Sequence, residues 1–540
     1  MSGIAARFTK VLLLAAVALA VTASSGAAAS RPHGQISGVV PHNGRPLLTP
    51  HLLSRAVIRT AGPTTLTFDA KYQNVINQYF TDVAHDSGGA NNVYSVATQY
   101  SDGTGAIQYQ STVGGAYVSH DPLPASGCDD GLDAYCLTDQ QLETEIQNVL
   151  TAKGWHGGLN HIFFLMTPNG VGSCFDSSSI DCSTNAFCAY HSYFTNSSSE
   201  SVIYANEPYE GPYPGCTDAT QGFPSDIDAD TTVNTISHEH NEAITDPLTD
   251  PANEAWIATD GSENGDLCAY GFGAAIGTAP NGQPYNQLIN NRPYSLQEEW
   301  SNPPRADTGC IQRPNDPNPQ PAQFGSPPLV NNGGPVMHTN TTYAIYWLPT
   351  ARNTSAPAVT GTPVVNSTLH SSAGVWAGGA TSESFQWQRC SSTGTSCADI
   401  AGATTSSYKL TTADGGHVVR STVRATNVNG ASSPAASAGS PAVVDIPTAT
   451  KAPHISGKAR VGKKLSGSHG SWTFAPMSYK LQWLRCNSHG AGCSSIGHAT
   501  HTTYKLTSRD AGHRLRLRVT ATNAAGSTAA TSPTSTRVTR

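Results

Sequence analysis

The chain has 540 residues, enough for three or four domains, and a formal net charge of −7 at pH 7. The charge is uneven, because residues 451–540 contain 14 Lys and Arg but a single acid, Asp510, and so carry a net charge of +13. No nucleic-acid-binding motif accompanies these cations, so the sequence gives no indication of a nucleic-acid partner.

The first residues have the pattern of a secretory signal peptide. Arg7 and Lys10 precede an apolar run, VLLLAAVALAV, which is too short to span a bilayer and leads to small residues. We expect cleavage near Ala29, so that residues 1–29 are the signal peptide and residues 30–64 an N-terminal extension. No other segment reaches the roughly 20 apolar residues of a transmembrane helix. The sequence therefore predicts a protein that is secreted, extracellular or bound at a cell surface.

Residues 65–312 have the patterns of a domain that mixes helices and strands. Apolar residues recur at helical spacing in FDAKYQNVINQYFTDVA and in TDQQLETEIQNVLTAKG, where Gly154 is a stop signal. Strand-like runs, NVYSVATQY, HIFFLMTP and SVIYANEP, lie between and after them. This alternation predicts an α/β or α+β domain.

Twelve cysteines in an exported chain are better explained by disulfides than by metal binding. Eight lie between Cys128 and Cys310 and four lie after residue 380, so both counts are even. No two CxxC pairs occur, which argues against a zinc ribbon. We therefore expect all twelve to form disulfides, and the pairing of the first eight stays open.

The stretch NTISHEHNEAITDP, residues 234–247, resembles a metal-binding helix with an altered last residue. A zinc protease helix reads His-Glu-x-x-His, whereas this frame gives His238, Glu239 and, at the last position, Glu242. At 100° per residue, His240 falls on the apolar stripe of the helix, and we expect it in the core. His238, Glu239 and Glu242 fall on the opposite side.

His238 and Glu242 are four residues apart, the spacing by which one helix offers two ligands to one metal ion. Zinc accepts a carboxylate oxygen as well as an imidazole nitrogen, so this pair is half of a feasible zinc site. Two other interpretations remain open. One is an HxH pair of His238 and His240 on a strand, which the helical pattern argues against. The other is a surface helix with solvated acidic side chains.

A third ligand must come from further along the chain. The segment DGSENGDLC contains Asp266 and Glu263, which is 21 residues after Glu242. We expect Glu263 to be the third zinc ligand and Asp266 to orient a ligand, with the two roles exchangeable. Glu239 would then be the general base for a metal-activated water. A calcium-like structural ion is an alternative because carboxylates are dense here, although a histidine ligand argues against it.

Other residues point less directly to chemistry. His191, in CAYHSYF, could stabilise an oxyanion but is better explained as a structural histidine beside Cys188. Trp256 and Trp300 are expected to be core residues. Catalysis by a Ser-His-Asp triad has no support, since the sequence has no GxSxG motif.

The stretches SHEHNEAITDPL, AWIATDGSENGDLC and YSLQEEWSN, together with CLTDQQLETEI and FCAYHSYF, resemble the exordium-like (phosphate-induced protein) family and its bacterial secreted relatives. The resemblance covers residues 65–312, and the order HExxE followed by ExGDxC is its most specific part. It implies a secreted protein with a zincin-like α+β domain; plant members are associated with growth at the cell wall. Peptidase activity is inferred from the site residues and not from the family.

The order of segments departs from that family. Its members typically open with a GGPV and IYW strand, whereas here GGPVMHTNTTYAIYW follows the domain, at residues 333–347. The intervening residues, 313–332, are rich in proline, which donates no amide hydrogen and favours an extended linker. We predict that Tyr343 to Trp347, within a segment of residues 333–350, adds a strand to the catalytic sheet from the C-terminal side, as in a circular permutation.

Two copies of one repeat follow, residues 355–443 and 451–540, in register at an offset of 96 residues. Period-two runs, a tryptophan in each copy and the turns TTADGG and TSRDAG predict immunoglobulin-like β-sandwiches. The repeats resemble the tandem immunoglobulin-like modules of secreted bacterial proteins, whose usual role is spacing or adhesion. The cysteines of each copy are only seven residues apart and are expected to clip a local hairpin loop: Cys390 with Cys397 and Cys486 with Cys493.

These features predict a secreted zinc-dependent hydrolase, most simply a gluzincin-like metallopeptidase that acts on a peptide or protein. The alternative is a non-catalytic cell-wall or surface protein with a structural or degenerate metal site. The basic repeat is expected to attract an anionic cell-wall polymer.

Overall fold

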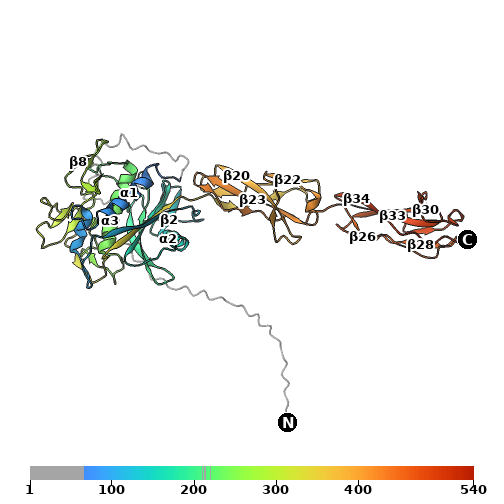
Figure 1. Cartoon of the computed structure of the whole chain (residues 1–540), viewed down its shortest axis with the longest axis horizontal. Helices are drawn as coiled ribbons and strands as arrows, with labels where there is room; N and C mark the ends of the chain where they lie inside the picture. Colours follow the sequence, from blue (N-terminus) through green and yellow to red (C-terminus); the bar gives the residue numbers. More distant parts are fainter. Residues whose placement is uncertain (1–65, 210, 212–214, 219) are drawn as a thin grey trace, which may run out of the picture.

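The computed structural model describes residues 66–540 except 210, 212–214 and 219. An N-terminal domain lies at one end, and two all-β repeats follow it in line to the C-terminus (Figure 1). The expected signal peptide (1–29) and extension (30–64) lie outside the described residues. Strands far outnumber helices in the described part of the chain, where no helix is long and apolar enough to cross a bilayer.

A five-stranded sheet forms the centre of the N-terminal domain. Its first four strands are parallel, and the last is antiparallel to its neighbour. In sheet order the strands are β1 (Ser111–Ser119), β15 (Asn340–Trp347), β3 (His161–Met166), β6 (Ser201–Glu207) and β5 (Tyr190–Thr195).

Alternate residues of the central strands face two different helical layers. Ile162 and Phe164 of β3 pack on the side of α1 (Tyr72–His85) and α3 (Ile227–Thr245). Phe163 and Leu165 pack on the opposite side, with α2 (Asp139–Lys153). Both sets are fully buried, which explains why IFFLM, residues 162–166, is apolar throughout instead of alternating. Figure 1 shows α1 and α3 together on one side of the sheet and α2 on the other.

Helix α2 follows the start and stop signals of its sequence. Thr138 and Gln141 form a capping box at its first turn, and Gly154 ends it with a φ of 66°. This left-handed backbone is one that glycine adopts without steric strain. Leu142, Ile146 and Val149 are buried against the sheet.

The segment after the proline-rich stretch contributes the strand β15, which lies between β1 and β3. Its residues pair from Thr341 with His161 to Tyr346 with Met166 on one side, and along β1 on the other. Ile345 is fully buried and Trp347 almost so. A strand that comes last in the sequence of this domain is thus in the interior of its sheet.

Residues 313–332 are not the extended linker that their prolines suggested. Gln320 and Cys310 exchange backbone hydrogen bonds, and the Gln323 amide donates to the Leu267 carbonyl. Val330 and Asn331, which form β14, pair with β7 (Trp256–Ile257). Because these backbone groups find partners on the N-terminal domain, the segment packs along it and leads into β15.

Short strands and 3-10 turns complete the N-terminal domain. They are η1 (Val93–Gln99), β2 (Tyr135–Thr138), β4 (Val171–Cys174), η2 (Asp266–Cys268), β8 (Gly277–Thr278), β9 (Pro284–Tyr285), β10 (Gln287–Ile289), β11 (Arg292–Tyr294), β12 (Glu299–Ser301) and β13 (Gly309–Ile311).

All twelve cysteines form disulfides, as the sequence predicts. Cys390 with Cys397 and Cys486 with Cys493 close local loops in the two repeats. The other four disulfides lie in the N-terminal domain and join Cys128 to Cys136, Cys174 to Cys182, Cys188 to Cys216, and Cys268 to Cys310.

Each repeat contains three small sheets and a fully buried tryptophan, Trp387 in repeat 1 (355–443) and Trp483 in repeat 2 (451–540). The indole N–H of each donates to a backbone carbonyl, of Thr405 and His501 respectively. The main strand pairs of repeat 1 are β20 (Ser382–Cys390) with β23 (Val418–Asn427) and β18 (Thr368–Ser371) with β22 (Ser407–Lys409). Those of repeat 2 are β30 (Ser478–Cys486) with β33 (Arg514–Asn523) and β28 (Lys464–Gly467) with β32 (Thr503–Lys505).

Hydrogen bonds join the three units end to end. The Asn427 side chain donates to the Pro349 carbonyl, where repeat 1 meets the N-terminal domain. At the corresponding position of repeat 2, the Asn523 side chain donates to the Asp445 carbonyl. Both junctions therefore contain the same type of hydrogen bond, from an asparagine side chain to a backbone carbonyl.

Candidate metal centre

Helix α3 carries the His-Glu-x-x-Glu motif and is buried on all sides. Asp226 caps its first turn by accepting hydrogen bonds from the backbone N–H groups of Asp228 and Ala229. Every residue from 229 to 245 is buried, the acidic side included. The interpretation as a surface helix with solvated acids is therefore wrong, because β5 and residues 263–268 cover that side of the helix.

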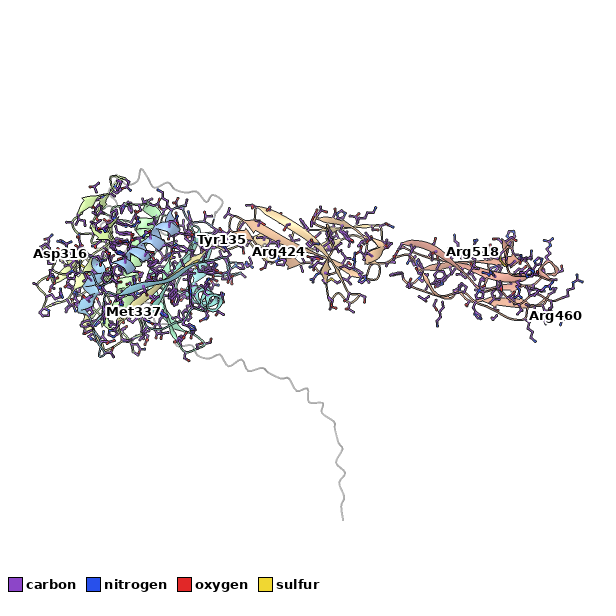
Figure 2. The ribbon with its side chains drawn as sticks, in the orientation of Figure 1. Tyr135, Asp316, Met337, Arg424, Arg460 and Arg518 are labelled. Atoms are coloured by element: carbon purple, nitrogen blue, oxygen red, sulfur yellow. A yellow bond between two sulfur atoms is a disulfide. The ribbon has the colours of Figure 1, made fainter. Side chains whose placement is uncertain are left out.

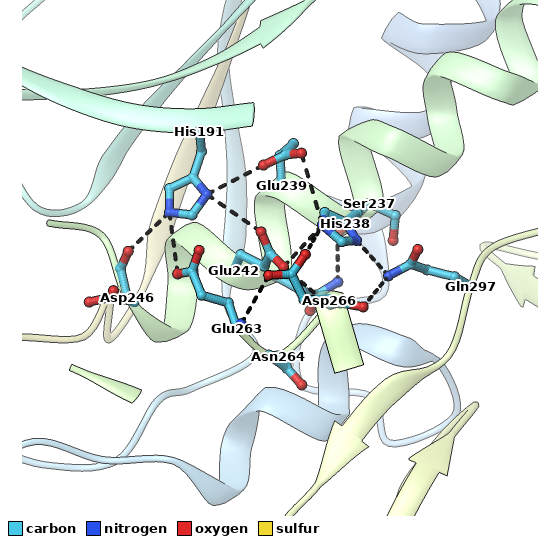
Figure 3. Close-up of polar contacts among 12 residues, drawn as sticks. His191, Ser237, His238, Glu239, Glu242, Asp246, Glu263, Asn264, Asp266 and Gln297 are labelled. Carbon is cyan, nitrogen blue, oxygen red and sulfur yellow. Dashed lines mark hydrogen bonds and ion pairs between the residues drawn. The ribbon is translucent and has the colours of Figure 1, made fainter. Parts of the chain in front are cut away.

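His238, Glu242 and Asp266 form one group of potential ligands (Figure 3). The Nε2 atom of His238 lies 3.0 Å from Oε1 of Glu242 and 3.8 Å from Oδ1 of Asp266. The Asp266 amide donates to Oε1 of Glu242 at 2.9 Å, which fixes this segment on the helix. Gly265 is required here, because a Cβ would lie 2.7 Å from Nδ1 of His238.

His191, Glu239 and Glu242 form a second group. Nδ1 of His191 lies 3.3 Å from Oε2 of Glu239 and 3.7 Å from Oε2 of Glu242. Its Nε2 lies 3.1 Å from the Asp246 carbonyl and 3.7 Å from Oε1 of Glu263. Since a carbonyl only accepts, Nε2 carries the hydrogen, and in the neutral ring Nδ1 presents its lone pair to the two glutamates. Glu242 thus directs one oxygen to each histidine.

The structure gathers the predicted site residues but pairs them differently from the expectation. His238 and Glu242 are neighbours, and the third group beside them is Asp266, the alternative ligand, while Glu263 lies beside His191 instead. Oε1 of Glu239 is 4.0 Å from Nε2 of His238, and its Oε2 faces His191.

Sequence reasoning missed the part that His191 takes in this cluster. His191 is fully buried on β5, next to Tyr190, which belongs to the opposite, α2 side of the sheet. Period-two alternation therefore turns His191 toward α3, a signal that becomes readable only once the place of β5 in the sheet is known. Gln297 was also missed. Its Nε2 lies 2.7 Å from Nδ1 of His238 and 3.0 Å from the Gly265 carbonyl.

His240 lies in the core, on the side of α3 away from the cluster. Its ring nitrogens lie 3.1 Å from the Tyr94 hydroxyl and 3.0 Å from Oδ1 of Asn340. Burial lowers the pKa of His240 to about 4. Trp300 is buried, and half-buried Trp256 packs against Tyr100.

Burial controls the electrostatics of the cluster. It raises the pKa of Glu239, Glu242, Glu263 and Asp266 well above the ordinary range, and the charge of Glu242 adds to this for the other three. Burial lowers the pKa of His238 to about 4. In the metal-free protein these groups therefore favour their uncharged forms.

Several potential metal-ligand atoms of the cluster have no hydrogen-bond partner among the described residues: Nε2 of His238, Oε1 of Glu239, Oε2 of Glu242 and both oxygens of Glu263. Within the described part of the chain, their ion-pair contacts are with one another and with His191 and Asp266, and none is with Lys or Arg. Uncompensated buried carboxylates are destabilising by several kcal/mol each. A divalent cation would supply the missing charge, and imidazole with carboxylate is a donor set that zinc accepts. The residues present therefore fit a metal ion.

Comparisons with known proteins place the chain in no family. No family model and no curated protein matches it. Among solved structures, it is similar to the "Crystal structure of Dscam1 isoform 7.44, N-terminal four Ig domains", with 12% sequence identity and a TM-score of 0.15. The match covers 38% of this chain and 50% of the other, so this chain spans about half of that structure. A score this low carries no argument about fold or function.

Proposed function

We propose that this chain is an exported, zinc-dependent hydrolase whose N-terminal domain is zincin-like. The observation that carries the proposal is the burial of His191, His238 and three glutamates in one cluster, with unpaired oxygens and no Lys or Arg within ion-pair distance among the described residues. Six disulfides support the exported location, because such bonds persist in oxidising surroundings.

His238 and Glu242 would hold the metal together with either Asp266 or Glu263. Asp266 already lies with the first two, whereas Glu263 has two oxygens without hydrogen-bond partners. Gln297 contacts the far nitrogen of His238 and so sets the orientation of its ring. A bound zinc ion would acidify a water molecule and polarise a substrate carbonyl.

Glu239 would act as the general base. For this role Glu239 must be ionised, so His191, whose Nε2–H is donated to the Asp246 carbonyl, would also carry a hydrogen on Nδ1 and donate it to Oε2 of Glu239. Its Oε1 has no hydrogen-bond partner and faces His238, so it can accept a proton next to the metal-binding atoms. This order of base and ligand on one helix is that of His-Glu-x-x-His peptidases, which makes a peptide bond the favoured substrate.

The Glu239→Gln variant tests this role. We expect it to bind as much zinc as the wild type while hydrolysis of a fluorogenic peptide library falls by about 100-fold or more, since general-base catalysis contributes roughly 10²–10⁴. Zinc content is measured by elemental analysis. Glu143→Gln on α2, on the other side of the sheet, is the matched control and leaves both zinc content and activity unchanged. Equal activity in the two variants would remove Glu239 from the mechanism.

A second candidate function is a non-catalytic surface protein with a structural metal ion. The observation that favours it is burial, because His238, Glu239 and Glu242 have no exposed surface among the described residues. A substrate must therefore gain access through a movement of the covering segments. Fully zinc-loaded wild-type protein that cleaves no member of the peptide library would favour this structural role.

A further inference from the structure

The two repeats share one fold but differ widely in charge. Repeat 1 contains 4 Lys and Arg residues and 3 acids, which gives a net charge of +1. Repeat 2 contains 14 Lys and Arg residues and 1 acid, which gives a net charge of +13. Their strand pairs and buried tryptophans correspond at the offset of 96 residues. The fold itself therefore does not require the additional cations of repeat 2.

Only three of the 14 cations of repeat 2 have a Lys or Arg at the corresponding position of repeat 1: Arg485, Lys505 and Arg516. Arg485 is structural. It pairs at 2.6 Å with Asp510, which is fully buried, as Arg389 pairs with Asp414 in repeat 1. The one acid of repeat 2 is thus already used inside the fold. The other eleven cations replace neutral residues of repeat 1.

Four cations gather on the outer surface of one sheet, which we name the basic face: Lys480 of β30 and Arg514, Arg516 and Arg518 of β33. On β33 they alternate with Leu515, Leu517 and Val519, which are fully buried and so turn the arginines outward. Gln482 pairs with Arg518 and Leu484 with Arg516, so the two strands present one continuous surface. The corresponding residues of repeat 1 are Ser384, Val418, Arg420 and Thr422.

Arg514 donates to the backbone carbonyls of Ser488 and Ser535, but carbonyls carry no net charge, so the cations of the basic face still repel one another. Side chains two residues apart on a strand are about 7 Å apart, which is within the Debye length of about 8 Å at physiological salt. Like charges at such distances repel, and Asp510 is not available to offset them. On the other sheet, Lys464 pairs directly with Lys505. A polyanion would relieve this repulsion.

We propose that the basic face of repeat 2 binds a flexible, linear polyanion of repeated phosphodiesters, such as a polyol-phosphate polymer outside the cell. Three of its four cations are arginines, whose planar guanidinium matches phosphate oxygens. The residues beside these cations on the same surface, Gln482, Leu484 and Thr520, offer no aromatic ring on which a nucleobase could stack.

The place of repeat 2 in the molecule suits an anchor. It is the unit farthest from the N-terminal domain, with repeat 1 between them (Figure 1). Figure 2 labels Arg518 on the surface of this repeat and Arg460 at its far end. A polymer held there would leave the N-terminal domain, with its candidate metal site, uncovered at the opposite end of the molecule.

The test measures binding of the full chain to poly(glycerol phosphate) at a series of salt concentrations. One triple variant gives the basic face the residues of repeat 1: Lys480→Ser, Arg514→Val and Arg518→Thr. We expect it to bind more weakly and to lower the slope of log K against log salt by about 2, since each phosphate contact contributes about 0.7 on a flexible chain. All three replacements already occur in repeat 1, so the fold is retained.

A second triple removes the same charge elsewhere in repeat 2: Lys463→Ser, Lys464→Thr and Arg509→Ala, again the residues of repeat 1. This second variant is expected to change the slope of log K against log salt by less than half as much as the first triple variant does. Equal effects of the two triples, absence of binding at low salt, or tighter binding to phosphatidylglycerol vesicles or single-stranded DNA would overturn the proposal. Glu239→Gln retains full polymer binding, so this outcome is independent of the hydrolase proposal.

Discussion

Glu242 is the residue at which the two halves of the buried cluster meet. One of its oxygens faces His238 and the other faces His191. In the familiar zinc-protease helix this position is a histidine, which offers one nitrogen to one metal ion. A carboxylate has two donor oxygens, so the exchange adds negative charge and lets a single side chain contact both histidines.

Gly265 lets the segment after α3 approach these ligands. In a Gly265→Ala variant, the added Cβ would lie 2.7 Å from His238 Nδ1 and 3.0 Å from Glu242 Oε1. We expect the displaced ligands to weaken zinc binding about 10–100-fold, the usual effect of disturbing the surroundings of a metal ligand. Competition titration with a zinc chelator measures this. Gly103→Ala, where a Cβ has open space, is the control, and equal affinities in both variants would contradict the argument.

The sequence predicted the positions of some of these residues in the fold but not of others, and the reasons are physical. Helical periodicity separated His240 from His238, because that signal is local to α3. It gave no sign that the acidic side of α3 is buried, since β5 and residues 263–268 cover it and both are distant in sequence. The choice between Glu263 and Asp266 likewise depends on how the 263–268 segment turns.

Among the helices and strands, β15 matters most for the fold of the N-terminal domain. The resemblance of the GGPV and IYW segment to a family strand predicted that Tyr343 to Trp347 joins the sheet, but this resemblance does not give the neighbours of a strand. The structure inserts it between β1 and β3, with Ala344, Ile345 and Tyr346 buried in the two layers. The proline-rich stretch was misread as a linker because composition does not show that its backbone bonds to the N-terminal domain.

A chain that ends at residue 332 tests the role of β15. We expect it to lack a cooperative thermal transition, because β1 loses its only sheet partner among the described residues and β3 loses one of two. Circular dichroism on heating measures this. A chain that ends at residue 446 keeps β15 and repeat 1 and is expected to melt cooperatively. A sharp transition in the shorter chain would show that the domain folds without its last strand.

Across the whole molecule, the N-terminal domain and the last repeat differ in the charged residues that they contain. The N-terminal domain holds buried acids and the last repeat holds exposed bases. In the metal-free protein, the pKa values of Glu239, Glu242, Glu263 and Asp266 are raised on folding, so the folded state binds more protons than the unfolded chain. Stability from these groups is therefore greatest below their unfolded pKa values of about 4 and falls as pH rises.

His238 and His240 act in the opposite direction, but only between their folded pKa of about 4 and the unfolded value of 6.5. We therefore expect the melting temperature of chelator-treated protein to fall as pH rises above about 6.5, where the histidines no longer oppose the carboxyls. Excess zinc should reduce this fall, because ionised ligands are then compensated. Scanning fluorimetry with and without zinc measures both slopes, and identical slopes would contradict a metal site at the cluster.

The central claim is that the buried cluster binds a metal ion, and metal content tests it most directly. The full chain, purified at neutral pH without chelator and analysed by elemental mass spectrometry, is expected to hold about one zinc ion per chain, the occupancy of a single site. Glu242→Gln, which changes the residue shared by both groups, is expected to hold almost none. Wild-type protein without zinc or another divalent metal, or a Glu242→Gln variant that keeps its full content, would contradict the account.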